Sequence, residues 1–257
     1  MMQELGQPGA EPCRVDLLTG DMKRSVDFYG RLFGWKTSGG NSGTEDSIDM
    51  YLGDELVAGF LNNDSGSECS DAWVTYLNVA DAHAASYSAG MYGGCVFLQP
   101  LEIQGQGTLA MIGDPTGIGV GLWQSSTVRG LTKASGRHGT RIWNELHTTK
   151  FEKVTHFYRD ALEWDLLSLS DTDEFRYQSY GQGPNAKAGI FDISGQPDPK
   201  PGWRTYFAVT DTDKALALAK NLGAKVLKQA QDSPFGRMAV LADPTGAEFS
   251  IIQTVPA

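Results

Sequence analysis

Hydrophobic positions follow the same series of spacings twice along this chain. In each half, apolar residues first alternate with polar ones and then recur every three to four residues, which predicts a strand followed by a helix. The positions at helical spacing are Met22, Val26, Tyr29 and Phe33 in the first half and Phe151, Tyr158 and Leu162 in the second. The strands that precede these helices are expected at about 13–19 and 142–148.

Further strands and a second helix complete each half. Two strands are expected after the first helix, at about 46–52 and 55–61 and, in the second half, at about 174–180 and 186–192. A strand ending at Val79 or Val209 then leads into a second helix, and three shorter strands close each half. Each half is therefore predicted to be two βαβββ units in succession.

Short polar motifs mark the ends of these elements. Asp21, Asp81 and Asp211 stand where the first residue of a helix needs a cap, and Thr149 followed by Glu152 has the pattern of a capping box. The tetrapeptide Asp-Pro-Thr-Gly joins the last two strands of each half, at 114–117 and 243–246, and its residues favour a type I turn.

The residues themselves repeat as well as their spacing. Asp27-Phe28-Tyr29 with Trp35 recurs as His156-Phe157-Tyr158 with Trp164, and Trp73-x-Thr75-Tyr76 recurs as Trp203-x-Thr205-Tyr206. This repeat predicts a tandem duplication, so a residue that only one half carries is a candidate for function. We expect an N-terminal extension at 1–12, a first domain at 13–124, a linker at 125–141 and a second domain at 142–257.

Composition narrows the classes of partner. The 257 residues suffice for two domains, and the net charge of −10 disfavours nucleic acid and favours cationic over anionic small molecules. No apolar run reaches the roughly 20 residues that cross a bilayer, so we expect a cytoplasmic protein without a membrane partner. Cys13, Cys69 and Cys95 are odd in number and have no counterparts in the second half, which argues against a disulfide framework.

Two stretches of the first half carry a family resemblance. Phe28-Tyr29-Gly30-Arg31-Leu32-Phe33-Gly34-Trp35, and Asp114-Pro115-Thr116-Gly117 followed by Gly121-Leu122-Trp123-Gln124, resemble the vicinal oxygen chelate superfamily. That superfamily includes glyoxalase I, bleomycin-resistance proteins and extradiol dioxygenases. The resemblance covers about 13–124 and 142–253 and implies an α+β fold of tandem glyoxalase-like domains, each an open mixed-sheet barrel of two βαβββ units. It implies no single activity, because one fold hosts many chemistries.

The resemblance also implies where a metal ion would bind. Metal-dependent members hold a divalent ion with His or Glu side chains from four strands of a barrel. The matching positions here are Arg14, Gly59, Val74 and Gly121 in the first half and Trp143, Gly189, Arg204 and Ser250 in the second. None offers a carboxylate or an imidazole, and arginine repels a cation. We therefore expect no metal and no other cofactor, and neither glyoxalase I nor dioxygenase activity by the usual route.

Strand alternation assigns further side chains to the two cavities that the resemblance implies. The expected ligand-binding residues are Arg14, Tyr76, Trp123, Trp143, Arg204, Tyr206, Glu248 and Ser250. The candidate catalytic residues are Asp16 and Glu145, which match in the repeat, and His147, which replaces Leu18 of the first half. Trp73 and Trp203 are expected to face away from the cavities and to pack under helices or at the contact between the halves.

Alternatives stay open for the candidate catalytic residues. Internal ion pairs would also explain the carboxylates, Asp16 with Arg14 and Glu145 with Arg204. Convergence of Glu145, His147 and Glu248 would instead make a non-standard metal or acid–base site.

Two functions fit this sequence. The first is metal-independent binding of a small aromatic or cationic molecule, as in bleomycin-resistance proteins. The second is a glyoxalase-like enzyme, such as a lyase, a hydrolase or a natural-product tailoring enzyme, with Glu145 in proton transfer. A scaffold for a protein partner ranks after both. The halves are expected to form a pseudo-dimeric monomer, with a homodimer as the alternative.

Overall fold

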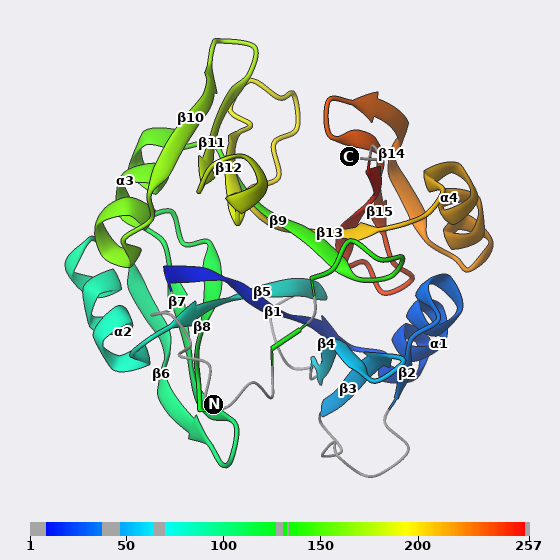
Figure 1. Ribbon diagram of the computed structural model, residues 1–257, viewed down its shortest axis with the longest axis horizontal. Helices are drawn as coiled ribbons and strands as arrows, with labels where there is room; N and C mark the ends of the chain where they lie inside the picture. Colours follow the sequence, from blue (N-terminus) through cyan, green and yellow to red (C-terminus); the bar gives the residue numbers. More distant parts are fainter. Residues whose placement is uncertain (1–8, 38–46, 64–69, 127–130, 133, 255–257) are drawn as a thin grey trace. The chain divides into compact units, whose positions relative to one another are not determined.

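The computed structural model describes residues 9–37, 47–63, 70–126, 131–132 and 134–254. The elements of the first half are β1 (Gly9–Thr19), α1 (Met22–Phe33), β2 (Lys36–Thr37), β3 (Ser47–Leu52), β4 (Glu55–Asn62), β5 (Ala72–Val79), α2 (Ala82–Met91), β6 (Cys95–Ile103), β7 (Gly107–Gly113) and β8 (Gly119–Ser125). The second half repeats this order with β9 (Arg141–Thr148), α3 (Phe151–Leu162), β10 (Leu166–Asp171), β11 (Arg176–Tyr180), β12 (Ala188–Asp192), β13 (Gly202–Ala208), α4 (Thr212–Asn221), β14 (Lys225–Ser233), β15 (Gly236–Ala242) and β16 (Glu248–Thr254) (Figure 1). A single turn of 3₁₀ helix, Gly183–Asn185, interrupts the second series.

Each half forms one open eight-stranded sheet. The strand orders are β2-β3-β4-β1-β5-β8-β7-β6 and β10-β11-β12-β9-β13-β16-β15-β14. β1 pairs with β4 and β5 with β8 in parallel, as do β9 with β12 and β13 with β16, whereas the hairpin strands are antiparallel. The mixed sheets confirm the predicted α+β class with four βαβββ units. No helix of the described residues is long and apolar enough to cross a membrane.

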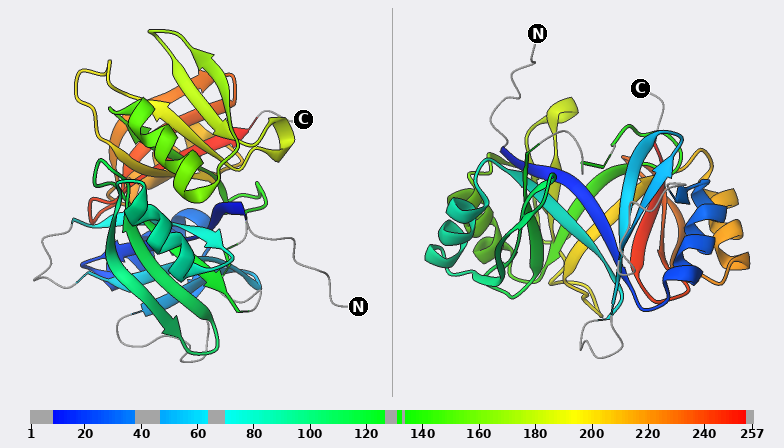
Figure 2. Two further views of the ribbon diagram at one scale, coloured as in Figure 1. Left: turned by 90° about the vertical axis from the view of Figure 1, so that its left-hand side faces the viewer. Right: turned by 90° about the horizontal axis from the view of Figure 1, so that it is seen from below.

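The chain divides into two compact units that do not follow the two halves. Unit 1 comprises Met1–Cys13, Thr75–Leu131 and Asn144–Trp203, and unit 2 comprises Arg14–Val74, Thr132–Trp143 and Arg204–Ala257. Helices α2 and α3 lie side by side in unit 1, and α1 and α4 do so in unit 2 (Figures 1 and 2). Since the sheets follow the halves and the compact units do not, the predicted domain boundaries stay a prediction.

Each unit has a hydrophobic core made from both halves. In unit 2, Leu17 and Phe28 from the first half pack with Phe207 and Phe249 from the second. In unit 1, Leu77 and Leu122 pack in the same way with residues of α3 and β12. The predicted place of the tryptophans under the helices is confirmed, because Trp73 packs against Tyr29 of α1 and Trp203 against Tyr158 of α3.

Several predicted helix starts and turns are confirmed. Asp21, Asp81 and Asp211 cap α1, α2 and α4, and each Asp-Pro-Thr-Gly turn closes with the Gly amide donating to the Asp carbonyl. The capping box at Thr149 is wrong, since α3 begins at Phe151 with Lys150 as its uncapped N-terminal neighbour. The amide of Lys150 instead bonds the hydroxyl of Thr148, so the chain enters α3 one residue later than the motif indicates.

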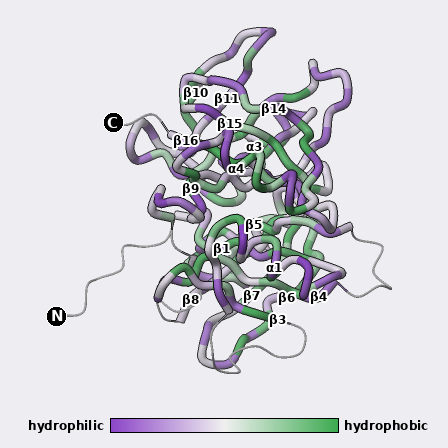
Figure 3. The backbone as a smooth tube through the Cα atoms, turned by 90° about the vertical axis from the view of Figure 1, so that its right-hand side faces the viewer, coloured by the Kyte–Doolittle hydropathy of each residue, from purple (hydrophilic) through white to green (hydrophobic). Residues whose placement is uncertain are grey.

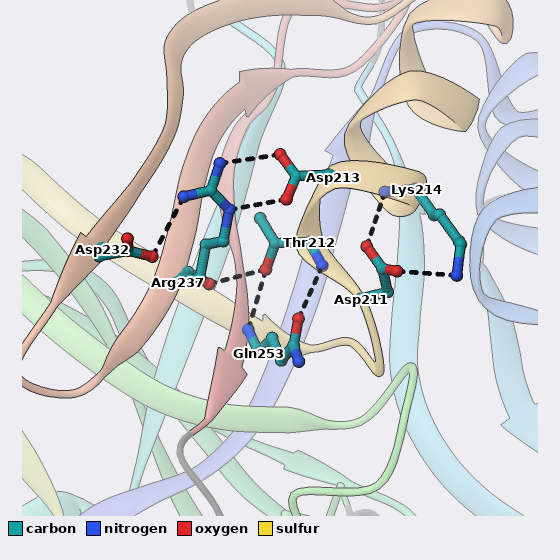
Figure 4. A network of polar contacts seen from close by, with 7 residues as sticks. All are labelled: Asp211, Thr212, Asp213, Lys214, Asp232, Arg237 and Gln253. Atoms are coloured by element: carbon teal, nitrogen blue, oxygen red, sulfur yellow. Dashed lines mark hydrogen bonds and ion pairs between the residues drawn. The ribbon is translucent and has the colours of Figure 1, made fainter.

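A polar network fixes the start of α4 to the strands beside it (Figure 4). Arg237 of β15 donates two hydrogen bonds to Asp213, at 2.7 and 2.9 Å, and a third to Asp232 at 3.1 Å. The hydrogen bonds from Arg237 lower the pKa of Asp213 below its usual value, so its carboxylate stays charged near neutral pH. The Gln253 side chain accepts from the amide of Thr212 at 3.3 Å, and Gln124 does the same for Ala82 of α2 at 2.9 Å.

Candidate functional site

The predicted site residues lie on the faces of the strands opposite the helices. Their immediate neighbours are core residues, among them Val15, Leu122, Leu146 and Phe249. Because side chains alternate along a strand, Asp16, Trp123, Glu145 and Glu248 point to the other face.

The site residues predicted for each half are divided between the two units. Unit 1 holds Tyr76, Trp123, Glu145 and His147, and unit 2 holds Arg14, Asp16, Trp143, Arg204, Tyr206, Glu248 and Ser250. Most of these side chains are buried, including Tyr76 and Trp123, whereas Trp143, His147, Arg204 and Glu248 are partly exposed.

Three glycines occupy positions that the family resemblance assigns to metal ligands. A Cβ atom built at Gly189 would overlap the hydroxyl and ring of Tyr177, and one at Gly121 would overlap the ring of Tyr76. At Gly59 it would overlap Arg14 and Asp16. Neighbouring side chains thus fill the space that a metal-binding side chain would need.

Groups that disfavour a divalent cation also stand at two of these glycines. Arg14 brings a permanent positive charge to Gly59, and the ring carbons of Tyr76 cannot coordinate a hard metal ion at Gly121. Across the described ranges, no three His, Cys, Asp or Glu side chains are grouped as metal ligands would be.

Glu145 of β9 is held by two side chains of unit 1. The Tyr177 hydroxyl from β11 donates to one carboxylate oxygen, Oε2, at 2.7 Å. The Nε2 atom of His147 lies 2.6 Å from the other oxygen, Oε1. The Glu145 and His147 side chains are 11% and 14% exposed, so solvent reaches both only in part. These two contacts hold the Glu145 carboxylate and the His147 imidazole together as a pair.

The matching position in the first half has a different arrangement. Asp16 accepts from Nε of Arg14 at 2.7 Å and from the amide of Gly59 at 3.1 Å. Arg14 also reaches Asp49 of β3 at 3.2 Å. The internal ion pair considered for Asp16 is therefore present, and Leu18 stands where the second half has His147.

Arg204 pairs with Glu248 in unit 2. The Arg204 guanidinium lies 2.9 Å from the Glu248 carboxylate, and Tyr206 stands beside Ser250 on the neighbouring strand. The partner suggested for Arg204 from sequence was Glu145, which belongs to unit 1. The same division separates Glu248 from Glu145 and His147, so their convergence stays a prediction.

The ring of Phe191 contacts His147 and also lines a cavity of unit 1. The ring of Phe191 lies edge-on to His147, with centroids 5.5 Å apart, and it also contacts Phe175 and Tyr177 at 5.5 and 6.0 Å. Phe191 lines a cavity of about 520 Å³. The other lining residues are Asp171, Thr172, Asp173, Glu174, Arg176, Asp192, Ser194, Gly195 and Gln196. Four of these residues, 171–174, lie at the end of the β10–β11 hairpin. The backbone there is coloured as hydrophilic in Figure 3.

Tyr177 and Phe191 were not among the residues predicted for the site. Phe191 could have been found, because it lies two residues after Gly189 and alternation puts both on one face. Tyr177 could not, since its contact with Glu145 depends on the register that pairs Tyr177 with Phe191.

Comparison with known proteins shows the family to which the chain belongs. The sequence profile described as Glyoxalase-like domain matches residues 144–252, and that of the Glyoxalase/Bleomycin resistance protein/Dioxygenase superfamily matches residues 13–122. A Mycobacterium tuberculosis protein with the provisional name glyoxylase CFP32 is 35% identical over 257 residues, which covers 95% of each chain. The chain belongs to the glyoxalase/bleomycin-resistance/dioxygenase superfamily.

Other superfamily members resemble this one over nearly its full length. The anthracycline biosynthesis protein DnrV of Streptomyces peucetius is 29% identical over 264 residues, covering 96% of this chain and 94% of its own. The 2,3-dioxygenase LapB from Pseudomonas sp. KL28 has a TM-score of 0.66 at 14% identity, covering 97% and 94% of the two chains. The Mn(II)-bound glyoxalase from Novosphingobium aromaticivorans has a TM-score of 0.63 at 15% identity, covering 96% and 84%. At these identities the two structures show a common fold alone.

Proposed function

We propose that this glyoxalase-like protein binds a small aromatic, cationic molecule without a metal ion. The observation that supports this most directly is the cavity of unit 1, about 520 Å³ in volume, which is lined by acidic side chains and by the ring of Phe191. Small-molecule sites commonly have this size and combine an aromatic surface with a few polar groups.

The charge of the cavity favours a cation. Four carboxylates and one guanidinium line it, which gives a net charge of −3. The guanidinium of Arg176 is already bound to Asp171, 2.6 Å away, and to Glu152, and it lies over the ring of Phe151. The remaining carboxylates are therefore left to attract a positive ligand, and Phe191 offers a ring face or edge beside them.

The names of two relatives support the aromatic part of the proposal. DauV of Streptomyces sp. strain C5 and DnrV of Streptomyces peucetius are named as anthracycline biosynthesis proteins. Anthracyclines are fused-ring aromatic compounds, so a related protein with an aromatic cavity wall is a reasonable host for a ligand of that class.

The test is a calorimetric titration with two matched probes, an anthracycline that carries an amino sugar and its uncharged aglycone. We expect the amine to bind more tightly, and Asp173→Asn with Asp192→Asn to weaken it about fivefold per charge, since one nearby charge contributes about 1 kcal/mol. Asp54→Asn, an exposed carboxylate of unit 2, is the matched control and should leave the affinity unchanged. Equal affinities for both probes, or no effect of the cavity variants, would contradict the proposal.

A second candidate function rests on a separate observation. The 2.6 Å contact of Glu145 with His147 is the kind of pair that transfers protons in enzymes. We propose, as this second candidate, a metal-independent lyase, hydrolase or tailoring enzyme. Mass spectrometry of a ligand that the titration identifies would show a new product with the native protein and none with Glu145→Gln. An unchanged ligand after long incubation would remove this candidate.

A further inference from the structure

We propose that His147, through its Nδ1 atom, is the proton acceptor of unit 1, and that Glu145 and Tyr177 are positioning residues. This inference deepens the second candidate function and rests on it. It also changes the role expected from sequence, in which Glu145 itself exchanges the proton.

The contacts of Glu145 determine which nitrogen of His147 carries hydrogen. An ionised carboxylate can only accept hydrogen bonds, and its Oε2 atom already accepts from Tyr177 at 2.7 Å. The 2.6 Å contact between Oε1 and Nε2 therefore requires a hydrogen on Nε2. A neutral imidazole with hydrogen on Nε2 has its lone pair on Nδ1, so the basic atom faces away from Glu145.

The surroundings of His147 leave Nδ1 open to a ligand. No hydrogen-bond partner of Nδ1 occurs among the residues that the structure describes, and the side chain is partly exposed. The groups against the ring are Glu145 on its own strand, whose carboxylate Tyr177 of β11 holds, and Phe191 of β12. Phe191 also lines the acidic cavity, so Nδ1 would be reached by the part of a ligand that extends from the cavity past the Phe191 ring.

The first half of the chain provides an internal comparison. At the matching position Asp16 is bound by Arg14 and the Gly59 amide, and Leu18 replaces the histidine. The ion pair of Asp16 is a structural contact, whereas the second half has exchanged it for a base and a carboxylate that orients it. The substitution His147→Leu therefore gives the second half the residue type that the first half has at this position.

The chemistry of this arrangement is transfer of one proton from a ligand. A C–H or O–H bond next to an aromatic ring would break, its electron pair would stay on the ligand, and the proton would form a bond with Nδ1. The resulting imidazolium would be stabilised by the Glu145 carboxylate 2.6 Å from Nε2, and no oxidant or metal is needed. Substrates are thus expected among aromatic molecules with an acidic hydrogen.

Nuclear magnetic resonance of the full chain labelled with ¹⁵N-histidine tests the tautomer directly. The four histidines give a simple spectrum, and His147→Leu assigns the signal of interest. At about pH 8 we expect an unprotonated Nδ1 and an Nε2 hydrogen that exchanges slowly. Glu145→Ala should make that hydrogen exchange as fast as in the exposed His83. A hydrogen on Nδ1, or fast exchange in the native protein, would overturn the proposal.

Reaction with diethyl pyrocarbonate tests whether Nδ1 is accessible and activated. The reagent attaches an ethoxycarbonyl group to an unprotonated imidazole nitrogen, and peptide mass mapping locates it. We expect His147 to react, and Glu145→Gln to slow this reaction about threefold or more while His83 reacts as before. The reason is that the glutamine amide can donate to Nε2 and so no longer holds the tautomer with its lone pair on Nδ1. Protection of His147 would overturn the proposal. Product formation that survives in His147→Leu would overturn the role of His147 and leave the enzyme candidate intact.

Discussion

At the scale of single residues, three glycines leave space for the larger side chains that occupy the candidate site. Gly59, Gly121 and Gly189 stand where the family resemblance places metal ligands, and each is covered by a larger neighbour. The absence of a side chain lets Tyr177 lie over Gly189 and reach Glu145. A metal-binding residue at one of these positions would therefore remove a contact that the present site uses.

Restoring a metal-type side chain at Gly189 should therefore destabilise the protein. Gly189→His would push Tyr177 from its place, and overpacking of this kind costs about 1–3 kcal/mol of the free energy of unfolding. Urea denaturation measures the loss. The double variant Gly189→His, Tyr177→Ala should recover part of it, because the clash is with that ring.

Gly90 provides the control for the Gly189 variants. A Cβ at this helical glycine would meet nothing within 4 Å, so Gly90→Ala should be neutral or slightly stabilising. If Gly189→His has the same free energy of unfolding as the native protein, Tyr177 does not need the space beside Gly189.

Residue types and strand alternation explain how much of the site could be foreseen. The pair of Asp16 with Arg14 was predictable, because both lie on one face of one strand two residues apart. The bond from Tyr177 to Glu145 was not, since it crosses two strand pairings whose register no short motif encodes. The division of the site residues between two units could not be predicted either, because the sequence repeat suggests two independent halves.

At the scale of elements, the repeated tyrosines show where the duplication has diverged. In α1, Tyr29 accepts from the indole of Trp73 and donates to Asp243, both at 3.0 Å. Burial, aided by the Asp243 charge, raises the pKa of Tyr29 well above its usual value, so its hydroxyl keeps the hydrogen that it donates. In α3, the equally buried Tyr158 hydroxyl has the Trp203 indole and the Asp114 carboxylate near it, but no hydrogen bond as short and well aligned as those of Tyr29.

This difference predicts unequal effects of the same substitution. Tyr29→Phe leaves the Asp243 oxygen and the Trp73 indole without this bond, which should cost about 1–3 kcal/mol of unfolding free energy. Tyr158→Phe removes a hydroxyl whose contact with the Trp203 indole is weaker, so it should cost less. Chemical denaturation of both variants measures the difference. An equal loss in the two would mean that Tyr158 is bonded as fully as Tyr29.

At the scale of the whole molecule, the two halves depend on each other. Each compact unit joins one βαβββ unit from the first half to one from the second, and each core contains residues of both. The sequence repeat correctly indicates four such units and two sheets. It could not indicate which pairs share a core, because all four βαβββ units have similar apolar faces.

This organisation predicts how the separated halves behave. A chain of residues 1–126 has the strands of one sheet but lacks the partner residues of both cores, so it should not fold as a stable monomer. Co-expression with residues 127–257 should restore a folded complex, as judged by circular dichroism and gel filtration. A cooperative, monomeric first half would contradict the dependence.

Both candidate functions require a site that works without a metal ion. Native mass spectrometry with elemental analysis tests this directly, on protein purified without chelators or affinity metals. We expect no stoichiometric divalent metal, and any copurified mass should be a small organic molecule that Asp173→Asn with Asp192→Asn releases. One divalent ion per chain would contradict the account, because the glycine positions would then have been wrongly matched to the metal ligands.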